Sequence, residues 1–98
     1  MALNIKWNRR ALKQFDDAIE HIESETPAGA EKVRTDILLR IDSLALNPGK
    51  YNPDKYKSGN DGSFRAFELH HYRVSYRHIK NEIRIIRIRH TKKNPIQY

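Results

Sequence analysis

Three short segments in the last third of the chain decide its fold: FRAFEL at 64–69, YRVSYRHI at 72–79 and EIRIIRIRH at 82–90. Each is rich in β-branched and aromatic residues, and a polar pair separates each segment from the next. This pattern is typical of short strands that follow one another in an antiparallel meander. We therefore expect a three-stranded sheet over 64–90.

The third segment carries isoleucines in both alternating phases. Simple alternation places Ile83 and Ile85 on one face of the strand and Ile86 and Ile88 on the other. A strand that is apolar on both faces is buried on both sides or lacks a partner. One pair of helices can cover only one face, so we expect apolar sheet surface to remain open. Such surface often marks a protein–protein contact.

In the second segment, Tyr72, Val74 and Tyr76 share one face and Arg73 lies on the other. Positive charge is concentrated in this part of the chain. From residue 64 onward there are nine Lys and Arg against two acids, whereas the first 63 residues carry ten of each, so the net charge of +7 belongs to the final 35 residues. Segregated charge indicates a polyanionic partner, either nucleic acid or an acidic protein segment. The alternative is a basic face that only keeps the protein soluble.

The first half of the chain predicts a strand and two helices. Residues 3–7 alternate apolar and polar, with the apolar side toward the helices, and Asn8 can cap a following helix. The helix expected from Arg9 to about Ser24 has its apolar stripe at Leu12, Phe15, Ile19 and Ile22, with Ala11 and Ala18 beside it.

A second helix is expected to start at Thr26 as N-cap with Pro27 in its first turn, and to stop at 47–49, which read Asn-Pro-Gly. Its apolar stripe is Ala30, Val33, Ile37, Ile41 and Leu44. The sequence thus predicts one α+β domain over 1–98: an N-terminal strand, a two-helix hairpin, and a three-stranded antiparallel meander whose twisted sheet packs on the hairpin.

Several classes of site and location are disfavoured. The chain of 98 residues has no cysteine, which excludes disulfides, thiolate nucleophiles and cysteine zinc sites. We expect no metal, because His70 and His71 are adjacent and would point to opposite faces of a strand. No leader or long apolar run is present, so a cytoplasmic protein without membrane insertion is expected. Residues 50–63 are a long polar connection, for which a functional or partner-ordered role is worth considering.

The basic residues suit one reaction that needs neither a metal nor a cofactor. A base can activate an RNA 2′-hydroxyl for attack on the adjacent phosphate, guanidinium groups can stabilise the phosphorane, and an acid can protonate the leaving oxygen. The same residues would equally serve phosphate binding without cleavage. The candidates are Arg73, Arg65, Lys93 and Tyr98.

In order and spacing, these parts resemble the RelE/ParE superfamily of bacterial toxins over nearly the whole chain. The resemblance is carried by IKW at 5–7, LALNP at 44–48, YRVSY at 72–76 and RIRHTKKNP at 87–95. It implies the toxic half of a type II toxin–antitoxin pair, neutralised by a small antitoxin whose tail tends to be acidic.

The superfamily divides by mechanism. RelE-like and YoeB-like members cut messenger RNA in the ribosomal A site, whereas ParE-like members inhibit DNA gyrase. Arg73 matches the arginine that the nucleases place at the scissile phosphate, 92–93 resembles the closing basic pair of RelE, and Tyr98 could stand for its C-terminal tyrosine.

Other positions depart from the nucleases. Ala66 and Phe67 largely replace the paired lysines of RelE, Arg65 falls near them but out of clean register, and no counterpart of the YoeB glutamate is found. The stretch ELHHY at 68–72 is more similar to ParE.

The leading hypothesis from the sequence is a ribosome-dependent mRNA endonuclease. In it, Arg73 stabilises the phosphorane with help from Arg65 and Lys93, and His90 or Tyr98 transfers protons. The alternatives are a gyrase inhibitor without nuclease activity and an inactive antitoxin-binding module that acts in operon autoregulation.

Overall fold

The computed structural model describes residues 2–93 and 96–98. It confirms the predicted fold class. The elements are β1 (Asn4–Trp7), α1 (Arg9–Glu25), α2 (Pro27–Ser43), β2 (Phe64–Leu69), β3 (Tyr72–Ile79) and β4 (Glu82–His90). The strand order is β1-β4-β3-β2, in which β2, β3 and β4 form the expected antiparallel meander and β1 pairs in parallel with β4. The sheet is therefore mixed.

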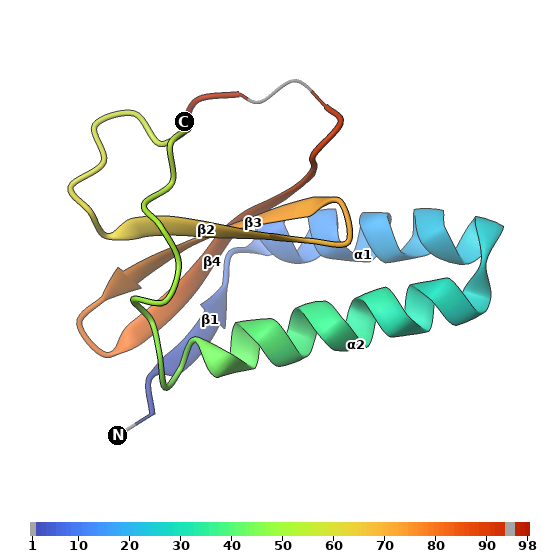
Figure 1. The fold of residues 1–98 in the computed structure, drawn as a ribbon, viewed down its shortest axis with the longest axis horizontal. Helices are drawn as coiled ribbons and strands as arrows, with labels where there is room; N and C mark the ends of the chain where they lie inside the picture. The colour runs from blue at the N-terminus through green and yellow to red at the C-terminus, as the bar shows by residue number, and fades with distance from the viewer. Residues whose placement is uncertain (1, 94–95) are drawn as a thin grey trace.

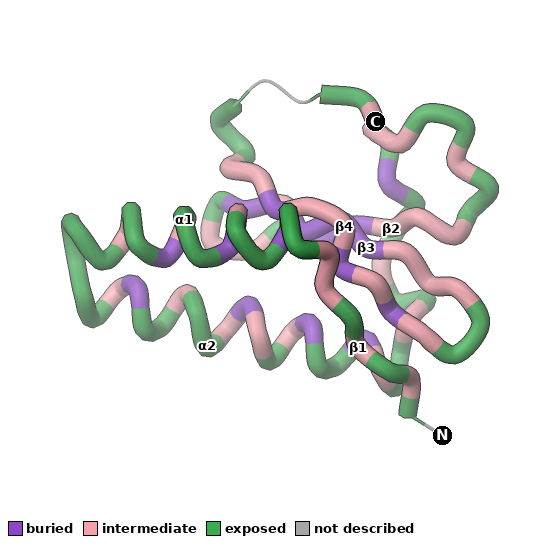
Figure 2. The backbone as a smooth tube through the Cα atoms, turned by 180° about the vertical axis from the view of Figure 1, so that it is seen from behind, coloured by how far each residue is buried: buried purple, intermediate pink, exposed green. Residues whose placement is uncertain are grey.

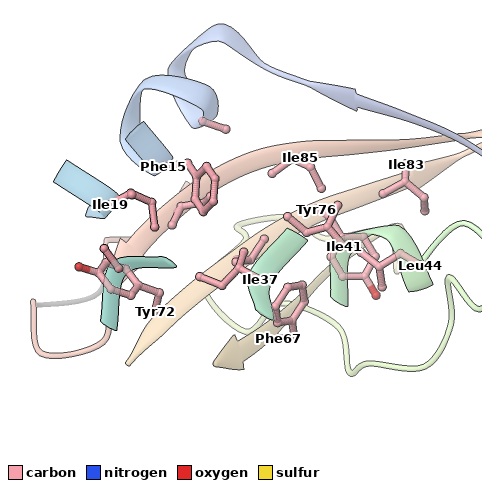
Figure 3. Packing of buried hydrophobic residues seen from close by; sticks show 14 residues of the cluster. Phe15, Ile19, Ile37, Ile41, Leu44, Phe67, Tyr72, Tyr76, Ile83 and Ile85 are labelled. Carbon is pink, nitrogen blue, oxygen red and sulfur yellow. The ribbon is translucent and has the colours of Figure 1, made fainter. Parts of the chain in front are cut away.

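The two helices lie side by side as a hairpin against one face of the sheet, and the link between them lies away from the strands (Figure 1). Buried residues recur along both helices and lie in the middle of the strands (Figure 2). The core joins Phe15 and Ile19 of α1 and Ile37 and Ile41 of α2 to sheet residues such as Tyr76 (Figure 3). Most of the predicted stripe residues lie in or against this core.

One β-bulge in β4 changes the alternation of its side chains. Tyr76 lies opposite Ile85, but its neighbour Ser75 lies opposite Arg87, so Ile86 is an extra residue without a cross-strand partner. An extra residue of this kind shifts every later side chain on that strand to the other phase. The two ends of β4 therefore follow opposite alternation patterns.

The bulge corrects the expectation of an open apolar face. Simple alternation would place Ile88 on the other face of the strand from Ile83 and Ile85. In the structure it is buried in the same core as these two residues and pairs with Val74 of β3. Of the four isoleucines of β4, only the bulge residue Ile86 is not buried in the core, and it is half-buried. The apolar side of β4 is covered by the helices and carries no open docking surface.

The same shift gathers the arginines on the opposite side of the sheet. Arg73 and Arg77 of β3 pair with Arg89 and Arg84 of β4, and Arg87 pairs with Ser75 between them. Because directly paired residues share a face, these five arginines occupy one side, which we call the basic face: Arg73, Arg77, Arg84, Arg87 and Arg89.

The helix ends differ in part from the expectations. Thr26 caps α2 through a bond from the Gly29 amide at 3.2 Å, as predicted. Asn8 occupies the N-cap position of α1, but its side chain makes no capping bond and accepts from Arg84 at 3.3 Å instead. Leu12 is 47% exposed, so Ala11 and not Leu12 begins the buried stripe.

Two more expectations need correction at the ends of elements. The α2 helix ends at Ser43, and turns over 44–46 follow it before the predicted Asn-Pro-Gly stop. His70 and His71 are not strand residues but form the turn between β2 and β3, with φ of +53° and +69°. Both lie in the left-handed region that costs energy for residues other than glycine. In the described part of the chain, no helix is long and apolar enough to cross a membrane.

Candidate functional site

Arg73 lies at one end of the basic face, near the start of β3, which runs between β2 and β4. Its two terminal nitrogens donate to carboxylates on different elements, to Asp54 in the loop before β2 and to Glu68 on β2, each at 2.9 Å. Its guanidinium also lies 4.9 Å from the centre of the Tyr56 ring. The side chain is only 17% exposed. Burial works to lower the pKa of Arg73, but the bonds to both carboxylates raise it, so the cation is firmly held.

Asp54 is the residue around which this site is built. Its side chain has no solvent exposure, and its two oxygens accept from Arg73, from the Tyr56 amide at 3.0 Å and from the Tyr98 hydroxyl at 2.5 Å. Burial tends to raise the pKa of Asp54, but these donors, together with the nearby Ser75 hydroxyl, hold the pKa below its usual value. Asp54 is therefore ionised at neutral pH.

The loop over 50–63 is held on the sheet by its own contacts. Pro53 forms a bridge with Arg65, the Asp54 amide donates to the Phe64 carbonyl at 2.9 Å, and the Asn60 side chain donates to that same carbonyl at 2.8 Å. These bonds fix the backbone on both sides of Asp54. The carboxylate is thereby aimed at the sheet, which a flexible connection could not achieve.

Tyr98 meets the basic face through both its hydroxyl and its ring. Burial, followed by the bond to Asp54, raises the pKa of Tyr98 to about 12, so the phenol remains a donor at neutral pH. The ring lies 4.0 Å from the guanidinium carbon of Arg87. Such a cation–π contact partly compensates Arg87 for the water it loses, and burial lowers the pKa of this arginine.

The structure brings some predicted site residues together and separates others. Arg73 and Tyr98 meet at Asp54. Lys93 and His90 border the same hollow as Arg73, and the volume of this hollow is about 70 Å³. Arg65 lies opposite Tyr76, on the helix-covered face, and donates to the Tyr51 carbonyl at 2.6 Å. Arg65 is therefore on the other side of the sheet from Arg73.

His90 lies at the end of β4, across from Tyr72, and its ring stacks with that of His71 at 6.3 Å. Burial, followed by the charges of nearby residues such as Lys92, lowers the pKa of His90. The Lys92 amide donates to Nδ1 at 3.0 Å. A neutral ring whose Nδ1 accepts must carry its proton on Nε2, so this histidine is a hydrogen-bond donor at Nε2.

Sequence reasoning missed Asp54, Arg87 and Ser75. Arg87 could have been found if the bulge had been foreseen, because it falls on the face of Arg73 only through that irregularity. Asp54 sits in a polar loop between Pro53 and Lys55, and no local signal distinguishes it from an ordinary turn residue. In the described ranges, no group of three or more His, Asp and Glu side chains could hold a metal ion.

Comparisons with known proteins agree on one fold. The chain is similar to a protein of the chromosomal ParDE toxin–antitoxin system of P. aeruginosa, with a TM-score of 0.74 and 22% identity over 93% of this chain and 98% of that one. It is also similar to a double arginine-to-alanine mutant of E. coli RelE in the free state, with a TM-score of 0.63 and 18% identity over 94% and 86% of the two chains.

The architecture is thus that of the RelE/ParE superfamily of toxins, as the sequence indicated. A family model described as the ParE toxin of the type II toxin–antitoxin system parDE matches residues 5–95, and the chain belongs to this family. Y4kP of Sinorhizobium fredii, which is named as a toxin, is 29% identical over 86 residues, covering 88% of this chain and 85% of that protein.

Proposed function

We propose that this type II toxin acts by binding its target without cutting RNA, and that the target is DNA gyrase. The observation that supports this choice is the double ion pair of Arg73 with Asp54 and Glu68. A guanidinium that stabilises a phosphorane must present its N–H groups to phosphate oxygens. Both terminal nitrogens of Arg73 already face carboxylates, so its positive charge is neutralised within the protein.

The groups considered for proton transfer also argue against cleavage of RNA. Cleavage at a 2′-hydroxyl needs a base within hydrogen-bond reach of that proton. Tyr98 is held protonated against Asp54 by a pKa raised to about 12, and Asp54 itself has no solvent exposure. His90 uses Nδ1 to accept from the Lys92 amide. The geometry therefore favours the gyrase alternative over the ribosomal nuclease that the sequence put first.

In this proposal a cognate antitoxin neutralises the protein. The similarity to a ParDE protein supports such a partner. The net charge of +7 favours an acidic antitoxin segment, because opposite charge speeds and strengthens association.

Two measurements in parallel test the proposal. The purified protein is added to DNA gyrase with relaxed plasmid, and supercoiling is followed on gels. In cells, the protein is expressed without an antitoxin, and messenger RNA ends are mapped by primer extension soon after induction. We expect growth arrest, inhibited supercoiling and intact messages.

The variants are chosen to separate charge from folding. Arg73→Lys keeps a cation beside Asp54 but loses the planar fork, and Arg77→Ala is the matched control on the same strand. Fresh cuts inside translated reading frames that disappear in Arg73→Lys and persist in Arg77→Ala would overturn the proposal in favour of the nuclease. Expression without any arrest would instead indicate an inactive antitoxin-binding module.

A further inference from the structure

Tyr98 is attached to the loop before β2 as if it were a strand residue. Its amide donates to the Tyr56 carbonyl at 3.0 Å, and its main-chain oxygen accepts from the Ser58 amide at 2.6 Å. Its hydroxyl reaches Asp54 from the same position. The backbone and the side chain of this one residue are thus both engaged.

The ring of Tyr98 covers basic side chains. Besides Arg87 at 4.0 Å, the ammonium of Lys57 lies 5.4 Å from the ring centre, and Phe64 meets the ring edge-on at 6.2 Å. In the described part of the chain, no carboxylate forms an ion pair with Arg87. The phenol ring therefore lies directly against this partly buried cation, which the charge of Asp54 also stabilises.

The start of the segment that carries Tyr98 is held at the end of β4, where the amides of residues 91–93 donate to His71 and His90. Residues 91–93 and 96–97 are all exposed, in contrast to Tyr98 itself. Segments with little burial open locally at much lower cost than the core. Tyr98 is the hydrogen-bonded anchor of the last described residues, 96–98, and this end of the chain can therefore release without unfolding the sheet.

Two hollows border Arg87. One, of about 70 Å³, is lined by Arg73, Lys93 and Ser75, whose buried hydroxyl has no partner in hydrogen-bonding geometry although it lies near Asp54. The other, of about 220 Å³, is lined by Tyr98 itself. Removal of the ring would enlarge the second hollow and leave Arg87 facing solvent from both.

We propose that Tyr98, pinned by Asp54, is an autoinhibitory cover on the basic face, and that its release exposes Arg87 to the phosphate groups of a polyanion. While the cover is docked, Arg73 is neutralised by carboxylates and one face of Arg87 is occupied by the ring. Once it is released, Arg87 needs a new partner, and a phosphate oxygen matches its planar fork. This inference goes beyond the proposed function, because it requires neither gyrase nor a ribosome.

The test uses a labelled single-stranded oligonucleotide as the polyanion and measures its binding by fluorescence anisotropy at several salt concentrations. Each additional phosphate contact steepens the dependence of log K on log salt by about 0.7 for a single strand. We expect Tyr98→Ala to bind more tightly with a steeper slope. Leu46→Ala, an uncharged change at an exposed side chain that lines neither hollow, should match the unaltered protein.

Hydrogen exchange at the Ser58 amide reports whether the cover is docked, and it should be faster in Tyr98→Ala. Faster exchange with an unchanged salt slope would overturn the proposal. Weaker binding in Tyr98→Ala would also overturn it, because the ring would then be a stacking surface for bases. If Tyr98→Ala fails to fold, Tyr98→Phe decides. It keeps the ring and loses the bond to Asp54, so the same changes should appear at smaller size, and their absence refutes the cover.

Because the assay contains only the protein and the oligonucleotide, its outcome is independent of the proposed target. Inhibition of gyrase together with the same salt slope in Tyr98→Ala and the unaltered protein would support the function and refute the cover. No inhibition of gyrase together with a steeper salt slope in Tyr98→Ala would support the cover and refute the proposed function.

Discussion

Arg73 Nη2 lies 2.9 Å from Asp54 Oδ1, and this ion pair joins the central strand of the sheet to a loop nineteen residues earlier. The carboxylate is fully buried, and the arginine side chain is 17% exposed. A buried charge is tolerated only when it is paired and hydrogen-bonded. The pair therefore determines two properties at once: how the loop is attached and how much free positive charge the basic face offers.

Removal of the Asp54 carboxylate should be strongly destabilising. In Asp54→Ala, Arg73 keeps only Glu68, and Tyr98 loses its acceptor. Breaking a buried pair from one side costs on the order of 3 kcal/mol in the free energy of unfolding. Urea denaturation at neutral pH measures this cost. Asp16→Ala, at an exposed carboxylate of α1, is the control and should change it by less than about 0.5 kcal/mol. Equal effects of the two substitutions would contradict the role of Asp54.

Acid should lower the free energy of unfolding partly through Asp54. Its pKa in the folded state is depressed below the ordinary 3.8, so its stabilising contribution is complete above that value and is lost as pH falls through the folded pKa. Asp54→Asn has no carboxylate to take up a proton, and its unfolding free energy should therefore fall less steeply in acid than that of the unaltered protein. Urea midpoints over a descending pH series measure the difference. Parallel curves for the two proteins would show that Asp54 does not contribute.

Alkali should also lower the stability of the protein, in this case through Tyr98. Burial and the bond to Asp54 raise its pKa from 10.0 to about 12, so its contribution to stability is present below pH 10 and is lost as pH rises through about 12. Burial raises the pKa of Tyr76 to about 12 as well. Absorbance of the tyrosinate should show a late step near pH 12 that becomes smaller in Tyr98→Phe and retains the part due to Tyr76. An unchanged late step in Tyr98→Phe would argue against the docked phenol.

The bulge predicts unequal roles for two isoleucines. Ile88→Ala removes a buried side chain from the core and should cost about 2–5 kcal/mol of unfolding free energy. Ile86→Ala, at the half-buried bulge residue, is the matched change and should cost clearly less. Chemical denaturation compares the two. Comparable losses would mean that β4 alternates regularly and that the bulge is absent.

Local sequence determined the elements of this protein. The segments 64–69, 72–79 and 82–90 coincide with β2, β3 and β4, because period-two runs of β-branched and aromatic residues are interrupted there by polar pairs. Thr26 and Pro27 mark the start of α2 in the same way, since a side-chain cap and a preset φ act within one turn. The family resemblance followed from the order of these elements.

Tertiary structure decided the site. The parallel pairing of β1 with β4 and the bulge at Ile86 depend on packing between distant segments, and the bulge alone determines that Ile88 lies in the core and Arg87 on the basic face. Asp54 becomes a buried hub only because 50–63 folds back onto the sheet and meets both Arg73 and Tyr98. Periodicity and capping are local properties that a sequence displays directly. The hydrogen bond between Tyr98 and Asp54, forty-four residues apart, exists only once the chain has closed on itself.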